Sequence, residues 1–402
     1  MAKPFDAGCI CTVVYQLCLA WIKEAGGLMN INNVSELGLK ELFSLRSDPV
    51  LVLLIIYIFS VSVYAVAKGV NYDVDNAAIA VVDEDHSALS RNITAAFLTP
   101  QFKTPEAISA ADIEQQLDNG KFLFIVSFPP NFEKDVLAGR QPQVQVLIDA
   151  TAIAQAGNGA NYIQEIIQRE ALSALSPGTQ LDNMLPVKTR IRKLFNPNSS
   201  SVWFNSLMQV INSITILGVI LTGAALIRER EHGTVEHLLV MPVTPAEIML
   251  AKIWANSLVI LIASVLSLQL VVTWWLDVPV QGSILLYVIA CILYLFSVTS
   301  LGIMLGIITN SMAQFALLLI PIVIMMYLLS GGTTPQESMP LFLQRVMMFS
   351  PSTHFVSLAQ NILYRGAGFN SVWPELVILA SIGAVFYSIA LAKFRKAIVT
   401  MG

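Results

Sequence analysis

Six long apolar runs constrain this sequence more than any other feature. A helix needs about 20 mostly apolar residues to cross the hydrocarbon core of a bilayer, and each run is close to that length. The charged fraction agrees, since only 12% of the residues are charged against about 25% in soluble domains. We therefore predict an α-helical membrane protein with six transmembrane helices. The runs are residues 50–67, 206–227, 253–276, 283–308, 313–330 and 376–392.

The six runs contain no Asp, Glu, Lys, Arg or His. Ion-driven carriers normally need ionisable groups inside their spans, so this argues against a proton- or sodium-driven carrier. The sequence also lacks a G-x-x-x-x-G-K-[ST] phosphate-binding loop. We expect no cofactor on this chain, and we expect any energy to enter through a separate ATPase that carries ATP and magnesium.

Basic residues near the apolar runs predict the orientation. Cytoplasmic loops are enriched in Lys and Arg, which places the short C-terminal tail in the cytoplasm. Six crossings then place residues 1–48 in the cytoplasm as well, with the first span at 49–68 and residues 69–205 in the periplasm. Spans two to six and their loops occupy residues 206–402. The tail residues concerned are Lys393, Arg395 and Lys396.

The first 28 residues precede all six predicted spans. Residues 1–28 include an apolar stretch that is too short for a span and lacks the basic start of a signal peptide. We interpret them either as an upstream extension or as an interfacial segment.

No cysteine spacing resembles a zinc site, so no metal site is predicted. The sequence also has no basic tract for nucleic acid. The cysteines are Cys9, Cys11, Cys18 and Cys291.

The predicted periplasmic segment has the pattern of a small α/β domain, because apolar strand-like runs alternate with helix-like ones. Asp83-Glu84-Asp85 follows the first strand and has two interpretations, a cation site or a cap for the next helix. We expect strands at 77–82, 122–128 and 144–148, and helices at 87–98, 110–119, 131–138 and 153–175.

The loop between spans two and three predicts a short exposed helix at 234–240. Gly233 allows a sharp turn and Thr234 can cap the helix, with Glu236 in its first turn. Leu238 and Leu239 lie on one apolar face with Val235, and Pro242 ends the helix. Such a helix could dock into a groove on a partner protein or rest on lipid headgroups.

The same loop resembles a known family. The stretch Glu229-Arg230-Glu231-x-Gly233-Thr234-x-Glu236-x-Leu238-Leu239-Val240-x-Pro242 is similar to the hallmark of ABC-2-type transport permeases. The resemblance extends over residues 29–402. It implies that helix 234–240 is a coupling helix that contacts a cytoplasmic ABC ATPase. It also implies a location in a bacterial inner membrane. The implied partners there are the lipid bilayer, a second permease copy, a periplasmic membrane fusion protein and an outer-membrane duct.

Residues 340–365 are too polar to cross the membrane and too apolar for a free loop. Pro351 divides them into two short helices, 340–349 and 352–364. We interpret them as a periplasmic re-entrant hairpin before span six, with an interfacial hairpin as the alternative. The resemblance extends to Leu329-Ser330-Gly331-Gly332 and to Pro351-x-x-His354-Phe355. The predicted gate residues are Gly331, Gly332, Pro351 and His354, although His354 by itself suits a structural hydrogen bond.

These expectations combine into one predicted function. The chain would be the membrane-spanning, non-catalytic permease subunit of an ATP-driven ABC exporter, moving an amphipathic or drug-like substrate out of the cytoplasm or inner membrane. The predicted coupling residues are Glu229, Arg230, Glu231, Gly233, Thr234, Glu236, Leu238, Leu239 and Pro242. The alternative is a membrane-anchored receptor or scaffold whose periplasmic domain binds a ligand or partner.

Overall fold

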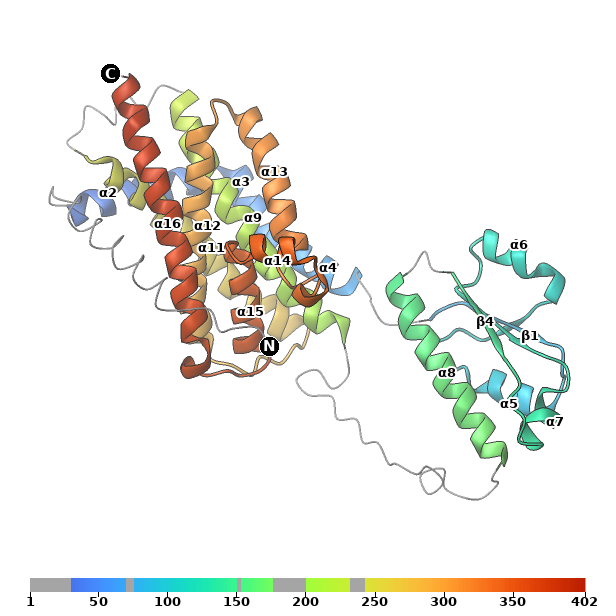
Figure 1. Ribbon diagram of the computed structural model, residues 1–402. Coiled ribbons are helices and arrows are strands. Elements are labelled where there is room, and N and C mark those ends of the chain that lie inside the picture. Colours follow the sequence, from blue (N-terminus) through green and yellow to red (C-terminus); the bar gives the residue numbers. More distant parts are fainter. Residues whose placement is uncertain (1–29, 70–75, 150–152, 176–199, 232–242, 402) are drawn as a thin grey trace. The chain divides into compact units, whose positions relative to one another are not determined.

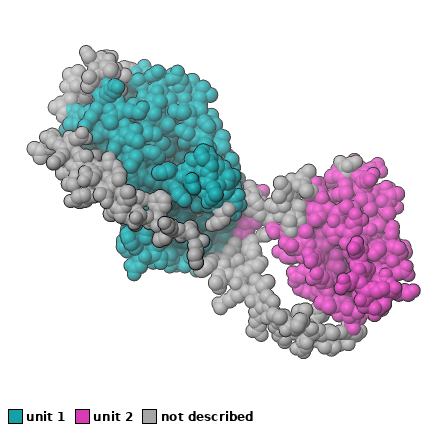
Figure 2. Space-filling model, viewed as in Figure 1, with its two compact units in different colours: residues 1–67, 203–402 teal, residues 68–202 magenta. Residues whose placement is uncertain are grey.

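A computed structural model describes residues 30–69, 76–149, 153–175, 200–231 and 243–401. The chain divides into two compact units, which Figure 2 colours separately. Unit 1 comprises residues 1–67 and 203–402, and unit 2 comprises residues 68–202. Unit 1 contains the apolar helices, and unit 2 coincides closely with the segment 69–205 that the composition sets apart.

Five helices of unit 1 are long and apolar enough to cross a membrane, within the described residues. They correspond to five of the six predicted spans. Two of them include π-helical segments, η1 (Ile58–Ser62) and η4 (Ser267–Trp275). The five are Pro49–Gly69 (α3, Pro49–Tyr57; η1; α4, Val63–Gly69), Ser201–Glu231 (α9), Pro245–Trp275 (α11, Pro245–Leu266, with η4), Ile284–Ile308 (α12) and Phe369–Lys396 within α16 (Phe369–Met401).

The remaining predicted span, 313–330, is a shorter helix. Helix α13 has 17 residues, Met312–Leu328, and carries Pro321 in its interior. About 20 residues are needed to cross perpendicular to the bilayer. The Ser311 side chain caps its start by accepting a hydrogen bond from Gln314 N. A six-span count therefore remains a prediction that rests on α13.

Helices α9 and α12 cross closely at glycines. A side chain at Gly302 of α12 would overlap Thr222 Oγ1 and lie 2.5 Å from Val219 O of α9. The contact is polar as well as close, since Thr222 Oγ1 donates to Thr299 O across the two helices at 3.3 Å. Small residues let membrane helices approach in this way. Figure 1 shows α9 and α12 side by side in the helical unit, with α16 along α12.

Besides α13, three further helices lie within the described residues of unit 1. Helix α2 (Ile31–Arg46) was not predicted, and it packs on α11. Helices α14 (Leu341–Met347) and α15 (Pro351–Leu363) lie where the hairpin is predicted. A short 3-10 turn, η5 (Gln336–Ser338), precedes them. Helix α15 is largely buried because α12, α13 and α16 pack around it.

Unit 2 is a four-stranded mixed sheet with helices on both faces. The strand order is β2-β1-β3-β4. Strand β1 pairs in parallel with β2 and β3, and β4 is antiparallel to β3. The α/β prediction is confirmed, and every predicted strand and helix is present; the two-residue β2 was missed. The elements are β1 Ile79–Asp83, α5 Ala88–Ala96, β2 Glu106–Ala107, η2 Ala110–Asp112, α6 Ile113–Asp118, β3 Phe124–Phe128, α7 Phe132–Leu137, β4 Gln145–Ile148 and α8 Ile153–Leu175.

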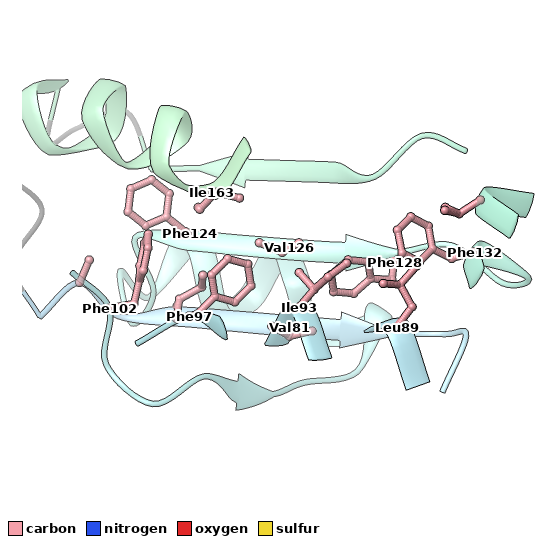
Figure 3. Packing of buried hydrophobic residues seen from close by; sticks show 13 residues of the cluster. Val81, Leu89, Ile93, Phe97, Phe102, Phe124, Val126, Phe128, Phe132 and Ile163 are labelled. Carbon is pink, nitrogen blue, oxygen red and sulfur yellow. The ribbon is translucent and has the colours of Figure 1, made fainter. Parts of the chain in front are cut away.

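The larger core of unit 2 lies on one face of its sheet. Figure 3 shows side chains of β1 and β3 meeting those of α5 and α8 there. Phe124 belongs to this core and lies edge-to-face with Phe102, at 5.9 Å between ring centroids. Gly159 of α8 lies directly over the Phe124 ring, where a side chain would overlap it. A smaller cluster around Ile125, Val82 and Leu117 fills the opposite face.

The acidic triplet after β1 is a capping element. Asp83 accepts hydrogen bonds from Asp85 N, His86 N and Ser90 Oγ, and Ser87 caps α5. Asp85 accepts one from Glu133 N at 3.0 Å. Burial alone would raise the pKa of Asp85, but its hydrogen bonds with Ser87 and the 131–133 backbone outweigh burial and lower the pKa. No cluster of three or more possible metal ligands occurs among the described residues.

Candidate functional site

Helices α9 and α11 flank the predicted coupling segment in the sequence, and α11 carries a buried lysine. Lys252 of α11 is 1% exposed. Its Nζ lies 2.7 Å from Glu229 Oε1 of α9 and 2.8 Å from Glu41 Oε1 of α2. A buried ammonium group is costly unless it is paired. This Lys252 cluster (Glu41, Glu229 and Lys252) therefore joins three helices at one point.

Helix α2 is held on α11 by three further contacts. The backbone N of Asn30, the N-cap residue of α2, donates to Glu247 Oε1 at 2.7 Å. Trp254 Nε1 donates to Val34 O at 3.1 Å. The indole ring of Trp254 lies against Gly38, with no room for a side chain there. The predicted cytoplasmic segment thus contributes a helix that is fixed to the third span.

Gly38→Val should separate α2 from α11. The new side chain would overlap the Trp254 ring, and overpacking of this kind costs about 1–3 kcal/mol. We expect a lower thermal unfolding temperature of the purified protein and increased exposure of Trp254 to an aqueous fluorescence quencher. Gly368→Val is the matched control, because nothing lies within 4 Å of a side chain added there. Equal behaviour of the two variants would contradict the packing described.

The end of α9 also contacts the turn between α12 and α13. Arg230 Nη1 donates to Thr309 O at 2.9 Å. Glu231 Oε1 accepts a hydrogen bond from Met312 N, the first residue of α13, at 3.0 Å. Arg228 lies 3.8 Å from Asp48, the cap of α3, in an exposed ion pair. Three predicted coupling residues, Glu229, Arg230 and Glu231, thus contact other helices or the α12–α13 turn of the same chain.

The rest of the predicted coupling segment lies outside the described residues. This applies to helix 234–240 and to its predicted residues. Helix α11 follows this segment, with Thr244 as its cap and Pro245 as its first residue. Glu247 completes a reciprocal capping box with Thr244. The residues concerned are Gly233, Thr234, Glu236, Leu238, Leu239 and Pro242.

The predicted gate residues lie where the ends of α13 and α15 meet. Gly331 has a φ of +91°, which favours glycine. Gly332 lies against Met208 of α9, and Pro351 is the first residue of α15. His354 Nε2 lies 2.8 Å from Met348 O, which satisfies the structural hydrogen bond expected of it. A gating role for the four residues stays a prediction.

Two residues of the Lys252 cluster, and one further carboxylate on α16, are absent from the residues predicted from the sequence. Lys252 lies just outside the predicted run 253–276, yet it is one helical turn from the buried Ile248 and on the same face. Glu41 was not considered because α2 was not predicted. Glu375 lies next to the predicted start of span six and is part of α16. The helical periodicity of charged residues at the ends of the predicted spans could have indicated Lys252 and Glu375, whereas Glu41 lies away from every predicted span.

The comparison with known proteins decides the family. Residues 49–392 match the family described as ABC-2 family transporter protein. The chain belongs to the ABC-2 family of transporter proteins. This agrees with the resemblance of the segment around Glu229–Pro242 and with the apolar helices of unit 1.

Three relatives of this ABC-2 protein come from Escherichia coli K12. The chain is 50% identical to the inner membrane transport permease YhhJ over 375 residues, 93% of this chain and 100% of the relative. It is 29% identical to the probable multidrug ABC transporter permease YbhR over 89% of this chain and 96% of the relative. It is 26% identical to the probable multidrug ABC transporter permease YbhS, over 84% and 90%.

Proposed function

We propose that this ABC-2 permease is the membrane-spanning subunit of an ATP-driven exporter. The observation that carries the proposal is the position of the Lys252 cluster. It fixes α9 and α11 to each other on the two sides of residues 232–242, the segment that resembles a coupling helix. A force applied to that segment would reach both helices and α2 together.

The partner would be a cytoplasmic ABC ATPase that binds ATP and magnesium. Closure of its two nucleotide-binding domains would push segment 232–242 of each of two permease copies. Because Arg230 and Glu231 bond to the turn before α13, the same push would reach α12 and α13. A packed set of helices moves as bodies rather than deforming smoothly. The spans would then tilt as rigid bodies and open the substrate path alternately to the two sides of the membrane.

The proposed substrate is an amphipathic or drug-like molecule. Two relatives are described as probable multidrug ABC transporter permeases, and the apolar spans suit a lipophilic cargo. The hairpin of α14 and α15 would form the outer gate, with Gly331 and Pro351 at its bends. Both chain termini and the loop after α9 would be cytoplasmic, and unit 2 would be periplasmic.

The further proposed partners follow from the family resemblance. A membrane fusion protein would dock on unit 2 and lead to an outer-membrane duct. A second copy of this permease or a paralogue would complete the substrate path. Large apolar side chains remain exposed along α3 and α13, which is consistent with contact to lipid or to that second copy. They include Val50, Leu53, Ile56, Leu317, Ile320 and Ile324.

Val235→Pro tests the coupling assignment. Proline removes a backbone donor and disrupts a helix interior, at a cost of about 3 kcal/mol. We expect ATP-dependent uptake of amphipathic dyes into inside-out vesicles to disappear, while the amount of inserted protein is unchanged. Val235→Ala is the control and should keep uptake. Full uptake by Val235→Pro would refute a coupling helix at 234–240.

A receptor or scaffold is the second candidate function, and one observation favours it. Unit 2 has a groove of about 900 Å³ between α8, α7 and the edge strand β4, lined by apolar side chains such as Val146 and Ile167. Arg140, a positively charged residue that lines the groove, forms an ion pair with Asp135 at 3.0 Å. Such a groove could bind a periplasmic ligand. In that case the chain would function without an ATPase.

A further inference from the structure

Helix α16 carries a carboxylate on its buried face. Val372, Leu376 and Leu379 are buried and follow the helical period, and Glu375 lies among them. The basic residues Lys393, Arg395 and Lys396 lie at the far end of the same helix. Glu375 is therefore an acidic group within an apolar helix face, near the end of α16 that is opposite to the basic tail.

The facing helix α15 presents a row of polar side chains. Thr353, Ser357 and Asn361 are four residues apart, so they share one face. Ser357 Oγ donates to Glu375 Oε1 at 2.9 Å, and Asn361 Nδ2 donates to Ser357 Oγ at 3.4 Å. The row ends at Arg365, whose Nη1 donates to Asn361 Oδ1 at 2.8 Å. One oxygen of Glu375 is thus held by the hairpin.

The second oxygen of Glu375 is buried and accepts no hydrogen bond from any described residue. Thr353 Oγ1, on the same face of α15, is also buried without a partner among the described residues. Glu375 takes part in none of the ion pairs found within the described ranges. Glu375 Oε2 is therefore left to accept a hydrogen bond or a positive charge from a bound molecule.

We propose that Glu375 is a specificity-determining residue that binds a positively charged group of the transported molecule. The proposal rests on the proposed export function. The positively charged group would lie against Glu375 Oε2, and the Thr353 hydroxyl would be available to a polar substituent of the same molecule. The apolar neighbours Val372 and Leu376 suit a hydrophobic body. The preferred class is therefore a monocationic amphiphile rather than an anionic or a hydrated inorganic ion.

Two probes of the same shape and opposite charge test this proposal. Tetraphenylphosphonium and tetraphenylborate are titrated against the full-length protein in nanodiscs, after subtraction of the signal from empty nanodiscs. The wild-type protein should prefer the phosphonium. Glu375→Gln should weaken phosphonium binding by about tenfold, the change expected from about 1.4 kcal/mol, and should leave borate binding equal or stronger. Glu375→Asp should retain the preference.

Controls separate the charge from the fold and from coupling. Glutamine keeps the oxygen that accepts from Ser357, so the unfolding temperature should hardly change. Glu36→Gln changes an exposed carboxylate of α2 and should bind both probes as the wild type does. Binding needs neither ATP nor partner, so a failure of export would not hide the result. Absence of a phosphonium preference in the wild type, or an unchanged preference in Glu375→Gln, would overturn the proposal.

Discussion

Lys252→Met is expected to destabilise the helical unit and to abolish ATP-dependent transport. The substitution leaves Glu41 and Glu229 facing each other without the ammonium group that lies within 2.8 Å of both. Removing one partner of a buried ion pair typically costs about 3–5 kcal/mol, because the remaining charge is uncompensated. The thermal unfolding temperature in detergent and dye uptake into inside-out vesicles measure the two effects.

Two further variants separate charge from packing in this cluster. Lys40→Met removes an exposed lysine from α2 and should leave both measurements near the wild-type values. The triple variant Lys252→Met, Glu41→Gln and Glu229→Gln removes every charge of the cluster, and we expect it to recover most of the unfolding temperature. A Lys252→Met protein as stable as the wild type would show that the cluster does not hold the three helices.

Gly302→Val is expected to have the second-largest effect, since it separates α9 from α12. A β-carbon at this position would overlap Thr222 Oγ1 and lie 2.5 Å from a backbone carbonyl of α9. The backbone cannot move aside as a flexible side chain can, so we expect a cost at or above the usual 1–3 kcal/mol of overpacking. The unfolding temperature and the yield of folded protein after size-exclusion chromatography report it.

The same substitution at Gly368 provides the control for Gly302→Val. Nothing lies within 4 Å of a β-carbon added to Gly368, so its yield and unfolding temperature should stay near the wild-type values. If Gly302→Val behaved like Gly368→Val, the close crossing of α9 and α12 would be wrong.

Much of the fold could be predicted from the sequence because its signals are local. Apolar length places five spans correctly, although the helices start up to eight residues before the predicted spans 253–276 and 376–392. In unit 2, turn residues and alternation place β1, β3 and β4 and the helices α5 to α8. Thr244-Pro245 predicts the start of α11 because the cap and the first-turn proline act on adjacent backbone groups.

The candidate site was harder to predict because it depends on contacts distant in sequence. Glu41 and Lys252 are 211 positions apart, and only tertiary packing shows that they meet. Ser357 and Glu375 belong to two helices whose facing sides cannot be known from either one alone. Residues 234–240 illustrate the converse. Their sequence pattern is clear, but they lie outside the described residues, so their coupling role stays a prediction.

The most direct test of the account is to purify the tagged permease with its native partners and measure ATP hydrolysis. We predict that a cytoplasmic ABC ATPase co-purifies and that it hydrolyses ATP faster with the permease in nanodiscs than it does alone. The Lys252→Met variant should reduce that stimulation. If no ATPase co-purifies, or if its rate is the same with and without this chain, the chain is not the permease of an ATP-driven exporter and the receptor function is favoured.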